Sequence, residues 1–123
     1  SIPLTVNEWD EWGDPRDPQF MTYMAGYSPY DNPPPAHVRP PLLVTGAVHD
    51  PRVLVREPAK WVSVLRATDP ALGAGDDPED PSAPGTVLFR VETGEGSHGG
   101  PAGRFGHLDY EAEVAAWILA ALT

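Results

Sequence analysis

The feature that most constrains the fold is a continuous, mainly apolar run at positions 42–48, with prolines before it and a His-Asp pair after it. Such a run is typical of a strand buried on both faces, as in a parallel sheet. A second run with strand character covers residues 86–91. We therefore expect two strands of one parallel sheet.

A helical pattern follows each of these strands. The first helix is expected at residues 58–67, with Pro58 at its first position, where a proline sacrifices no helical hydrogen bond. The second is expected to begin after a capping Asp109, because apolar residues then recur with helical spacing. These apolar positions are 110, 114, 117, 118, 121 and 122.

The order strand, helix, strand, helix predicts a βαβα unit of an α/β fold, with parallel strands and flanking helices. Two parallel strands cannot enclose a core, so we expect further strands on an N-terminal chain that is not part of residues 1–123. The first residues agree with this expectation, because Ser1 is not an initiator Met and no signal-peptide pattern follows it.

Three other segments have simpler patterns. A short helix is expected to end at Gly26, because glycine commonly follows a helix C-terminus. Residues 31–41 contain five prolines and predict an extended connector. Residues 69–84 are rich in Gly, Pro and acids without periodicity, which predicts a mobile surface loop.

Composition excludes several functions. Eighteen acidic residues against eight Lys and Arg give a net charge of −10, which argues against nucleic-acid binding and favours cationic partners, although a solvated acidic surface is the commoner explanation. The absence of cysteine excludes a disulfide, a thiol nucleophile and a Cys-based metal site. No apolar stretch approaches the roughly 20 residues of a membrane span. No His-x-x-x-His spacing or similar cluster occurs, so neither a metal nor a cofactor is expected.

Two residues that suit acid–base chemistry follow the two expected strands. Asp50 comes directly after the first strand, and His98 lies in a glycine-rich segment after the second. Catalytic groups of such sheets gather at the carboxyl ends of the strands. An acid followed by a histidine is also the order of these partners in α/β hydrolases, where the carboxylate orients the imidazole that activates a serine.

The spacing alone leaves plain alternatives open. An Asp-Pro step after a strand is also an ordinary turn, and a glycine-rich loop with a histidine is often merely solvated. No Gly-x-Ser-x-Gly motif surrounds any of the five serines, and Ser97 lacks the strand-turn-helix setting of a nucleophile. The chain by itself is therefore expected to be inactive.

Longer motifs, in a specific order, cover nearly the whole chain. They are NEWDEWGDP at 7–15, YSPYDN at 27–32, LLVT at 42–45, HDPRV at 49–53, EPAKWV at 57–62 and HGG at 98–100. In this order they resemble the C-terminus of the prolyl oligopeptidase family of serine peptidases. The resemblance implies the last part of an α/β-hydrolase catalytic domain, with the nucleophilic serine and a β-propeller on the preceding chain.

The resemblance also implies site residues and a substrate class. Asp50 and His98 would be the acid and base of a Ser-Asp-His triad, and Glu8 and Asp10 would form a pocket for the Arg or Lys after which short peptides are cut. Arg52 would contact the peptide backbone, or else make a structural ion pair. The implied partners are the serine-bearing N-terminal fragment and basic peptides, with no nucleic acid or membrane, and the implied location is the cytoplasm.

Other functions stay open beside this one. A prolyl-specific or aminopeptidase-type relative would lack the basic-residue pocket, and a non-catalytic acidic binding fragment would have lost the site. The chain also departs from the family pattern. Ser97 replaces a usual glycine before the histidine, Asp10 replaces a frequent glutamate, and the acidic segment 69–84 is longer than usual.

Overall fold

The computed structural model describes residues 3–68, 83 and 85–122. The chain divides into two compact units, one ending at Pro33 and the other beginning at Pro34. Each unit is described by itself. The expectation of a mobile loop at residues 69–84 falls almost entirely outside the described residues.

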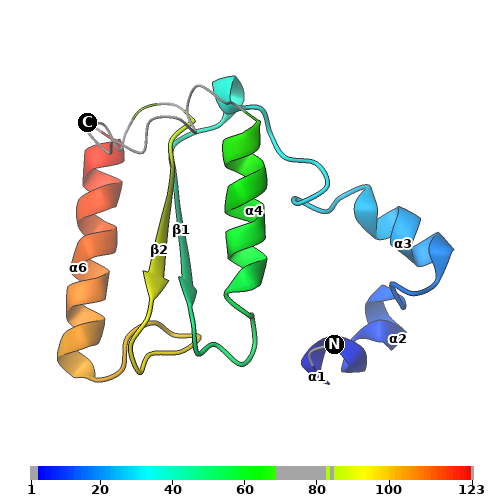
Figure 1. Ribbon diagram of the computed structural model, residues 1–123, viewed down its shortest axis with the longest axis horizontal. Coiled ribbons are helices and arrows are strands. Elements are labelled where there is room, and N and C mark those ends of the chain that lie inside the picture. Colours follow the sequence, from blue (N-terminus) through cyan, green and yellow to red (C-terminus); the bar gives the residue numbers. More distant parts are fainter. Residues whose placement is uncertain (1–2, 69–82, 84, 123) are drawn as a thin grey trace. The chain divides into compact units, whose positions relative to one another are not determined.

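The first unit consists of three short helices, α1 (Pro3–Asn7), α2 (Trp9–Trp12) and α3 (Pro18–Ala25) (Figure 1). The sequence predicted only α3, which ends before Gly26 as expected. Its start is set by local chemistry, because the Asp17 carboxylate accepts a hydrogen bond from the backbone N–H of Gln19 at 2.8 Å and Pro18 occupies the first helical position.

The second unit contains the predicted βαβα order. Strand β1 (Leu42–Ala47) leads to helix α4 (Arg56–Ala67), and strand β2 (Val87–Glu92) leads to helix α6 (Arg104–Ala121). The strands pair in parallel, with Leu42 opposite Val87 and Ala47 opposite Glu92. The prediction of parallel strands with flanking helices is confirmed.

Helix α4 packs against one face of the strand pair through apolar side chains. Val62 and Leu65 of α4 are buried with Val87, and Leu42, Val44, Trp61 and Phe89 pack around them. Because side chains alternate along a strand, the residues between these point to the other face. Pro58 is the third residue of α4, not the first as predicted. The first backbone N–H groups of a helix have no helical partner, so proline is compatible with any position of this turn.

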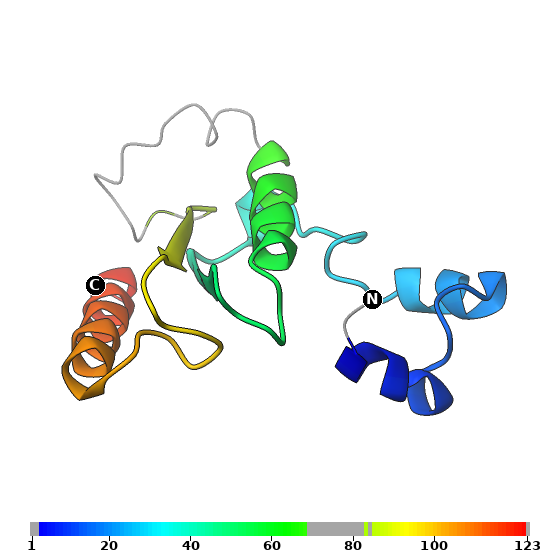
Figure 2. The same cartoon turned by 60° about the horizontal axis from the view of Figure 1, so that its bottom comes forward.

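Helix α6 lies on the opposite face of the strands, as Figures 1 and 2 show together. Arg90, which alternates with the α4-facing Phe89, reaches Glu113 of α6. The predicted start at Asp109 is wrong: α6 begins at Arg104, where Gly103 at φ 79° ends the preceding loop and its carbonyl accepts from the His107 N–H. The apolar periodicity predicts that a helix is present, but it does not indicate the residue at which the first turn begins.

The proline-rich connector is not wholly extended, since Ala36–Val38 form one turn of 3₁₀ helix. The next residue, Arg39, is buried, with 3 % of its surface exposed. Its guanidinium donates to the carbonyl oxygens of Leu65 at 3.1 Å and Gly85 at 2.7 Å. These bonds place its positive charge at the carbonyl-rich end of α4, where the helix dipole favours a cation. Arg39 thus ties the connector to α4 and to the start of β2.

Candidate active site

Asp50 lies just beyond the carboxyl end of β1 and is 6 % exposed. Its Oδ1 accepts hydrogen bonds from the backbone N–H groups of Arg52 at 2.8 Å and Val53 at 3.0 Å. This is the turn that an Asp side chain makes with the backbone that follows it. The turn fixes the carboxylate through one oxygen and leaves the other free to accept a second partner.

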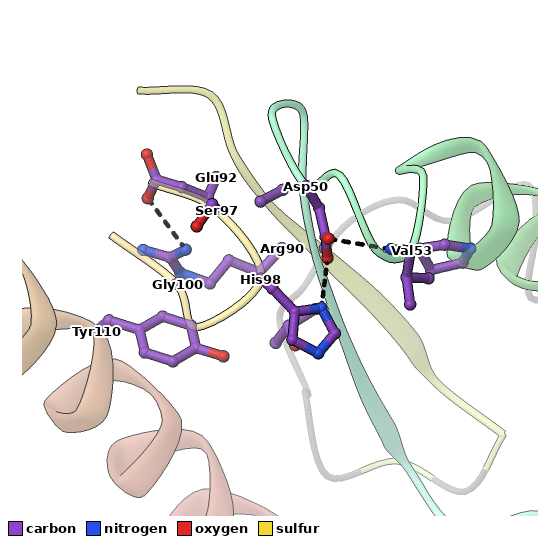
Figure 3. A pocket seen from close by; sticks show the side chains of 12 residues that line it. Asp50, Val53, Arg90, Glu92, Ser97, His98, Gly100 and Tyr110 are labelled. Carbon is purple, nitrogen blue, oxygen red and sulfur yellow. Dashed lines mark hydrogen bonds and ion pairs between the residues drawn. The ribbon is translucent and has the colours of Figure 1, made fainter. Parts of the chain in front are cut away.

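His98 is that second partner. Its Nδ1 lies 2.8 Å from Asp50 Oδ2, across 48 residues of sequence (Figure 3). The contact exists because the two parallel strands end at the same edge of the sheet. The imidazole is 48 % exposed, whereas the carboxylate side chain is 7 % exposed. A buried acid therefore holds a solvent-accessible base.

The charge state of Asp50 favours this pairing. Burial acts to raise its pKa, but hydrogen bonds from the Val53 N–H, the His98 ring and the Arg52 N–H outweigh burial and lower the pKa below its ordinary value. The residue is thus an anion at neutral pH. An anionic acceptor on Nδ1 selects the tautomer with its proton on Nδ1 and leaves the Nε2 lone pair available as a base.

A tight turn presents His98. Ser97 and Gly100 exchange backbone hydrogen bonds on either side of it, from the Ser97 N–H to the Gly100 carbonyl at 3.0 Å and in the reverse direction at 2.9 Å. Gly100 has φ 95°, which strains any residue with a side chain. Gly96 lies so close to the Gly100 carbonyl oxygen that a Cβ there would overlap it. The glycines around His98 are therefore needed to form this turn.

The other predicted site residues are placed as follows. Glu8 immediately precedes α2 and Asp10 lies in its first turn, and both are exposed. They belong to the first unit, whereas Asp50 and His98 belong to the second. Arg52 is exposed next to Asp50, and no ion pair of its guanidinium occurs within residues 3–68, 83 and 85–122. The roles of Glu8, Asp10 and Arg52 stay predictions.

The sequence analysis missed three residues that line the same pocket as Asp50 and His98. They are Arg90 and Glu92 of β2 and Tyr110 of α6 (Figure 3). The available signal was the charge of Arg90 inside the otherwise apolar run 86–91, followed by Glu92 two residues later. Ser97 also lines the pocket, next to His98.

Two further observations concern ligands and membranes. No group of three or more His, Cys, Asp or Glu that could hold a metal ion is found in the described part of the chain. No helix within those residues is long and apolar enough to cross a bilayer.

The strand order and the Asp50–His98 hydrogen bond are those of α/β hydrolases that activate a nucleophile through a histidine. Comparison with known proteins gives the family: the model of the prolyl oligopeptidase family matches residues 1–123, and the chain belongs to that family.

Individual relatives agree with this assignment. The chain is 44 % identical to Protease 2 of Moraxella lacunata and 40 % identical to Dipeptidyl aminopeptidase BI of Pseudoxanthomonas mexicana, in each case over 97 % of its length. The solved structure of oligopeptidase B from Leishmania major matches 98 % of the chain with a TM-score of 0.74 and 34 % identity. This match confirms the α/β-hydrolase fold. The chain spans only 14–15 % of the length of these relatives.

Proposed function

We propose that this chain supplies the acid and the base of a serine oligopeptidase that cuts short peptides after Arg or Lys. The observation that carries the proposal is the 2.8 Å hydrogen bond between Asp50 Oδ2 and His98 Nδ1 at the carboxyl ends of two parallel strands. A buried anion and a half-exposed imidazole oriented through Nδ1 are what nucleophilic catalysis requires of these two residues.

In the proposed reaction the nucleophile is a serine on a preceding segment of the same enzyme, which also carries the β-propeller. His98 Nε2 takes the hydroxyl proton as the serine oxygen attacks the scissile carbonyl. The imidazolium then gives this proton to the leaving amine, which yields an acyl-enzyme. Water then attacks the acyl-enzyme, with His98 again as the base, and the acid product is released as the serine regains its proton. Asp50 stays ionised throughout and stabilises the imidazolium.

Glu8 and Asp10 are proposed to bind the basic side chain of the substrate. Glu8 immediately precedes α2 and Asp10 lies in its first turn, and both carboxylates are exposed, so a substrate cation has access to them. A guanidinium suits this arrangement, because its donors lie in a planar fork that pairs with carboxylates. Arg52 is proposed to bind the peptide backbone near the scissile bond. A cytoplasmic location is expected from the family resemblance alone.

The test uses the protein assembled from this chain and the serine-bearing segment. A fluorophosphonate should label the serine, and both Asp50→Asn and His98→Ala should lower kcat for an Arg-containing peptide by at least about 10³-fold. Glu111→Gln, on the exposed surface of α6, is the matched control and should leave kcat unchanged. A normal kcat in His98→Ala would reject the proposal, and an assembled protein that resists the probe would indicate a non-catalytic acidic binding fragment.

An aminopeptidase is the second candidate, because one of the similar proteins is a Dipeptidyl aminopeptidase BI at 40 % identity. Two pairs of substrates separate the candidates. An oligopeptidase cleaves a peptide with a blocked amino terminus, whereas an aminopeptidase requires the free amine. The pocket of Glu8 and Asp10 predicts a preference for Arg over norleucine before the cleaved bond, and Glu8→Gln with Asp10→Asn should abolish it. If the double variant keeps this preference, these residues do not form the pocket.

A further inference from the structure

A set of side-chain contacts connects helix α6 with the loop that carries His98. Three residues make it, namely Arg90, Glu92 and Tyr110, and we call them the brace. We propose that the brace positions His98 against Asp50, an inference that rests on the proposed catalytic role of that pair. Glu92 and Tyr110 lie next to the loop and Arg90 connects them, so all three are positioning residues.

Glu92 is the end of the brace that holds the start of the loop. Its Oε1 accepts a hydrogen bond from the Gly94 backbone N–H at 2.7 Å, and its Oε2 lies 3.6 Å from an Arg90 guanidinium nitrogen. The Glu92 side chain is 15 % exposed, which strengthens both interactions. A Cβ on Gly96 would lie 2.8 Å from Glu92 Cγ, so the loop passes directly over this side chain. Glu92 thereby restrains the segment before Ser97 at Gly94 and lies against it at Gly96.

Arg90 joins the strand to helix α6. Its Nε donates to Glu113 Oε2 at 2.6 Å, and its guanidinium carbon lies 4.6 Å from the centroid of the Tyr110 ring (Figure 3). A guanidinium over an aromatic face gains a cation–π attraction in addition to packing. Two side chains of one helix, three residues apart, therefore contact the same guanidinium.

Tyr110 is the end of the brace that supports the far side of the turn. A Cβ on Gly100 would meet the Tyr110 ring at 3.5 Å, which is ordinary van der Waals contact. Gly100 is the residue that closes the turn around His98 through its two backbone bonds with Ser97. The brace therefore bonds to the loop at Gly94, before His98, and the Tyr110 ring lies next to Gly100, after it.

The need for such support follows from the exposure of His98. Half of the imidazole is open to solvent, and its hydrogen bond to Asp50 restrains only one ring nitrogen. A displacement of about 1 Å of a catalytic group can cost on the order of 100-fold in rate. Side chains that lock the loop would keep Nε2 at the position the serine requires.

The test compares variants of the assembled protein by kinetics and by hydrogen exchange. Glu92→Ala should lower kcat about 10- to 100-fold with KM within about twofold, and should speed backbone exchange in residues 93–103. Glu92→Gln keeps an acceptor for the Gly94 N–H and should recover most of kcat. Tyr110→Phe keeps the ring and should behave as the parent, whereas Tyr110→Ala should resemble Glu92→Ala. Glu111→Ala, an exposed acid of the same helix, is the control.

The outcomes separate the brace from the proposed function. A parent protein without peptidase activity rejects the proposed function, and the exchange measurement then tests the brace alone. An active parent whose Glu92→Ala variant keeps kcat and slow exchange at 93–103 rejects the brace. A variant with a lower melting temperature but unchanged kcat also rejects it, because that result assigns Glu92 to stability only.

Discussion

The two faces of the β1–β2 strand pair are covered in different ways. On one face α4 contributes Val62 and Leu65 to an apolar cluster with Val87. On the other face the contacts with α6 near the site are polar: Arg90 pairs with Glu113 and lies over Tyr110. Apolar burial is non-directional and stabilises many orientations equally, whereas paired charges and a stacked guanidinium require one geometry.

This difference assigns separate tasks to the two faces. The α4 face holds the strands together, and the α6 face orients the loop on which His98 lies. The Arg90–Glu113 pair that joins α6 to this face is partly exposed, with side-chain exposures of 26 % and 60 %, so it contributes little to the free energy of unfolding. Substitutions on the two faces should therefore affect different measurements, and the following predictions test this separation.

The largest effect on stability is expected at Leu65, which is fully buried on the α4 face. Leu65→Ala should lower the free energy of unfolding by about 2–5 kcal/mol, because it removes buried methyl groups and leaves a cavity. Urea denaturation measures the loss, with Trp61 beside the cluster as a fluorescent reporter. Leu122→Ala removes the same side chain at a site 79 % exposed and should change stability by less than about 0.5 kcal/mol. Equal losses in the two variants would contradict the assignment.

A smaller effect on stability, but a clear one on activity, is expected at Arg90 on the α6 face. Arg90→Met keeps much of the aliphatic volume and removes the charge, so unfolding should change by no more than about 1 kcal/mol. The rate of peptide cleavage should still fall about tenfold, since the loop loses its connection to α6. Activity per folded molecule, measured well below the melting temperature, distinguishes the two effects. If Arg90→Met lost as much stability as Leu65→Ala and kept normal activity, the two faces would not have the separate tasks assigned to them.

The smallest effect is expected from the titration of Asp50. Its pKa is lower in the folded state than the ordinary value of 3.8, so the folded protein binds fewer protons than the unfolded chain between these two values. This stabilisation is present above pH 4 and is lost as the pH falls through the folded pKa. In Asp50→Asn the urea midpoint should therefore change less between pH 5 and pH 3 than in the parent. An identical change in both proteins would show that Asp50 does not contribute.

Local patterns were enough to predict the main elements of the second unit. The strands and helices have periodicities that depend on neighbouring residues. The strand bounds differ from prediction by one residue, and the two helices begin two residues before the predicted Pro58 and five residues before the predicted cap Asp109. In the first unit α1 and α2 escaped prediction, since helices of five and four residues are too short to show a periodicity. In α2 the Trp9 ring has the Arg16 guanidinium 4.1 Å from its centroid, a contact that no periodicity reveals.

The Asp50–His98 pair was predictable because it depends on chain order and on one rule of parallel sheets, namely that strands end at a common edge. The brace was not predictable, because Arg90 of β2 and Tyr110 of α6 belong to different elements and meet only through the packing of α6 beside the strands. An isolated charge in an apolar strand indicates that a partner is needed, but it does not identify the partner.

The sequence by itself therefore determined the order of elements, the family and the two residues that we propose as acid and base. Only the tertiary structure decided the parallel register, the 2.8 Å contact between Asp50 and His98, and the side chains that support the histidine turn. The physical reason is the range of the interactions. Periodicity and turn chemistry act between near neighbours in sequence, whereas charge pairing and ring stacking act between side chains that only packing brings together.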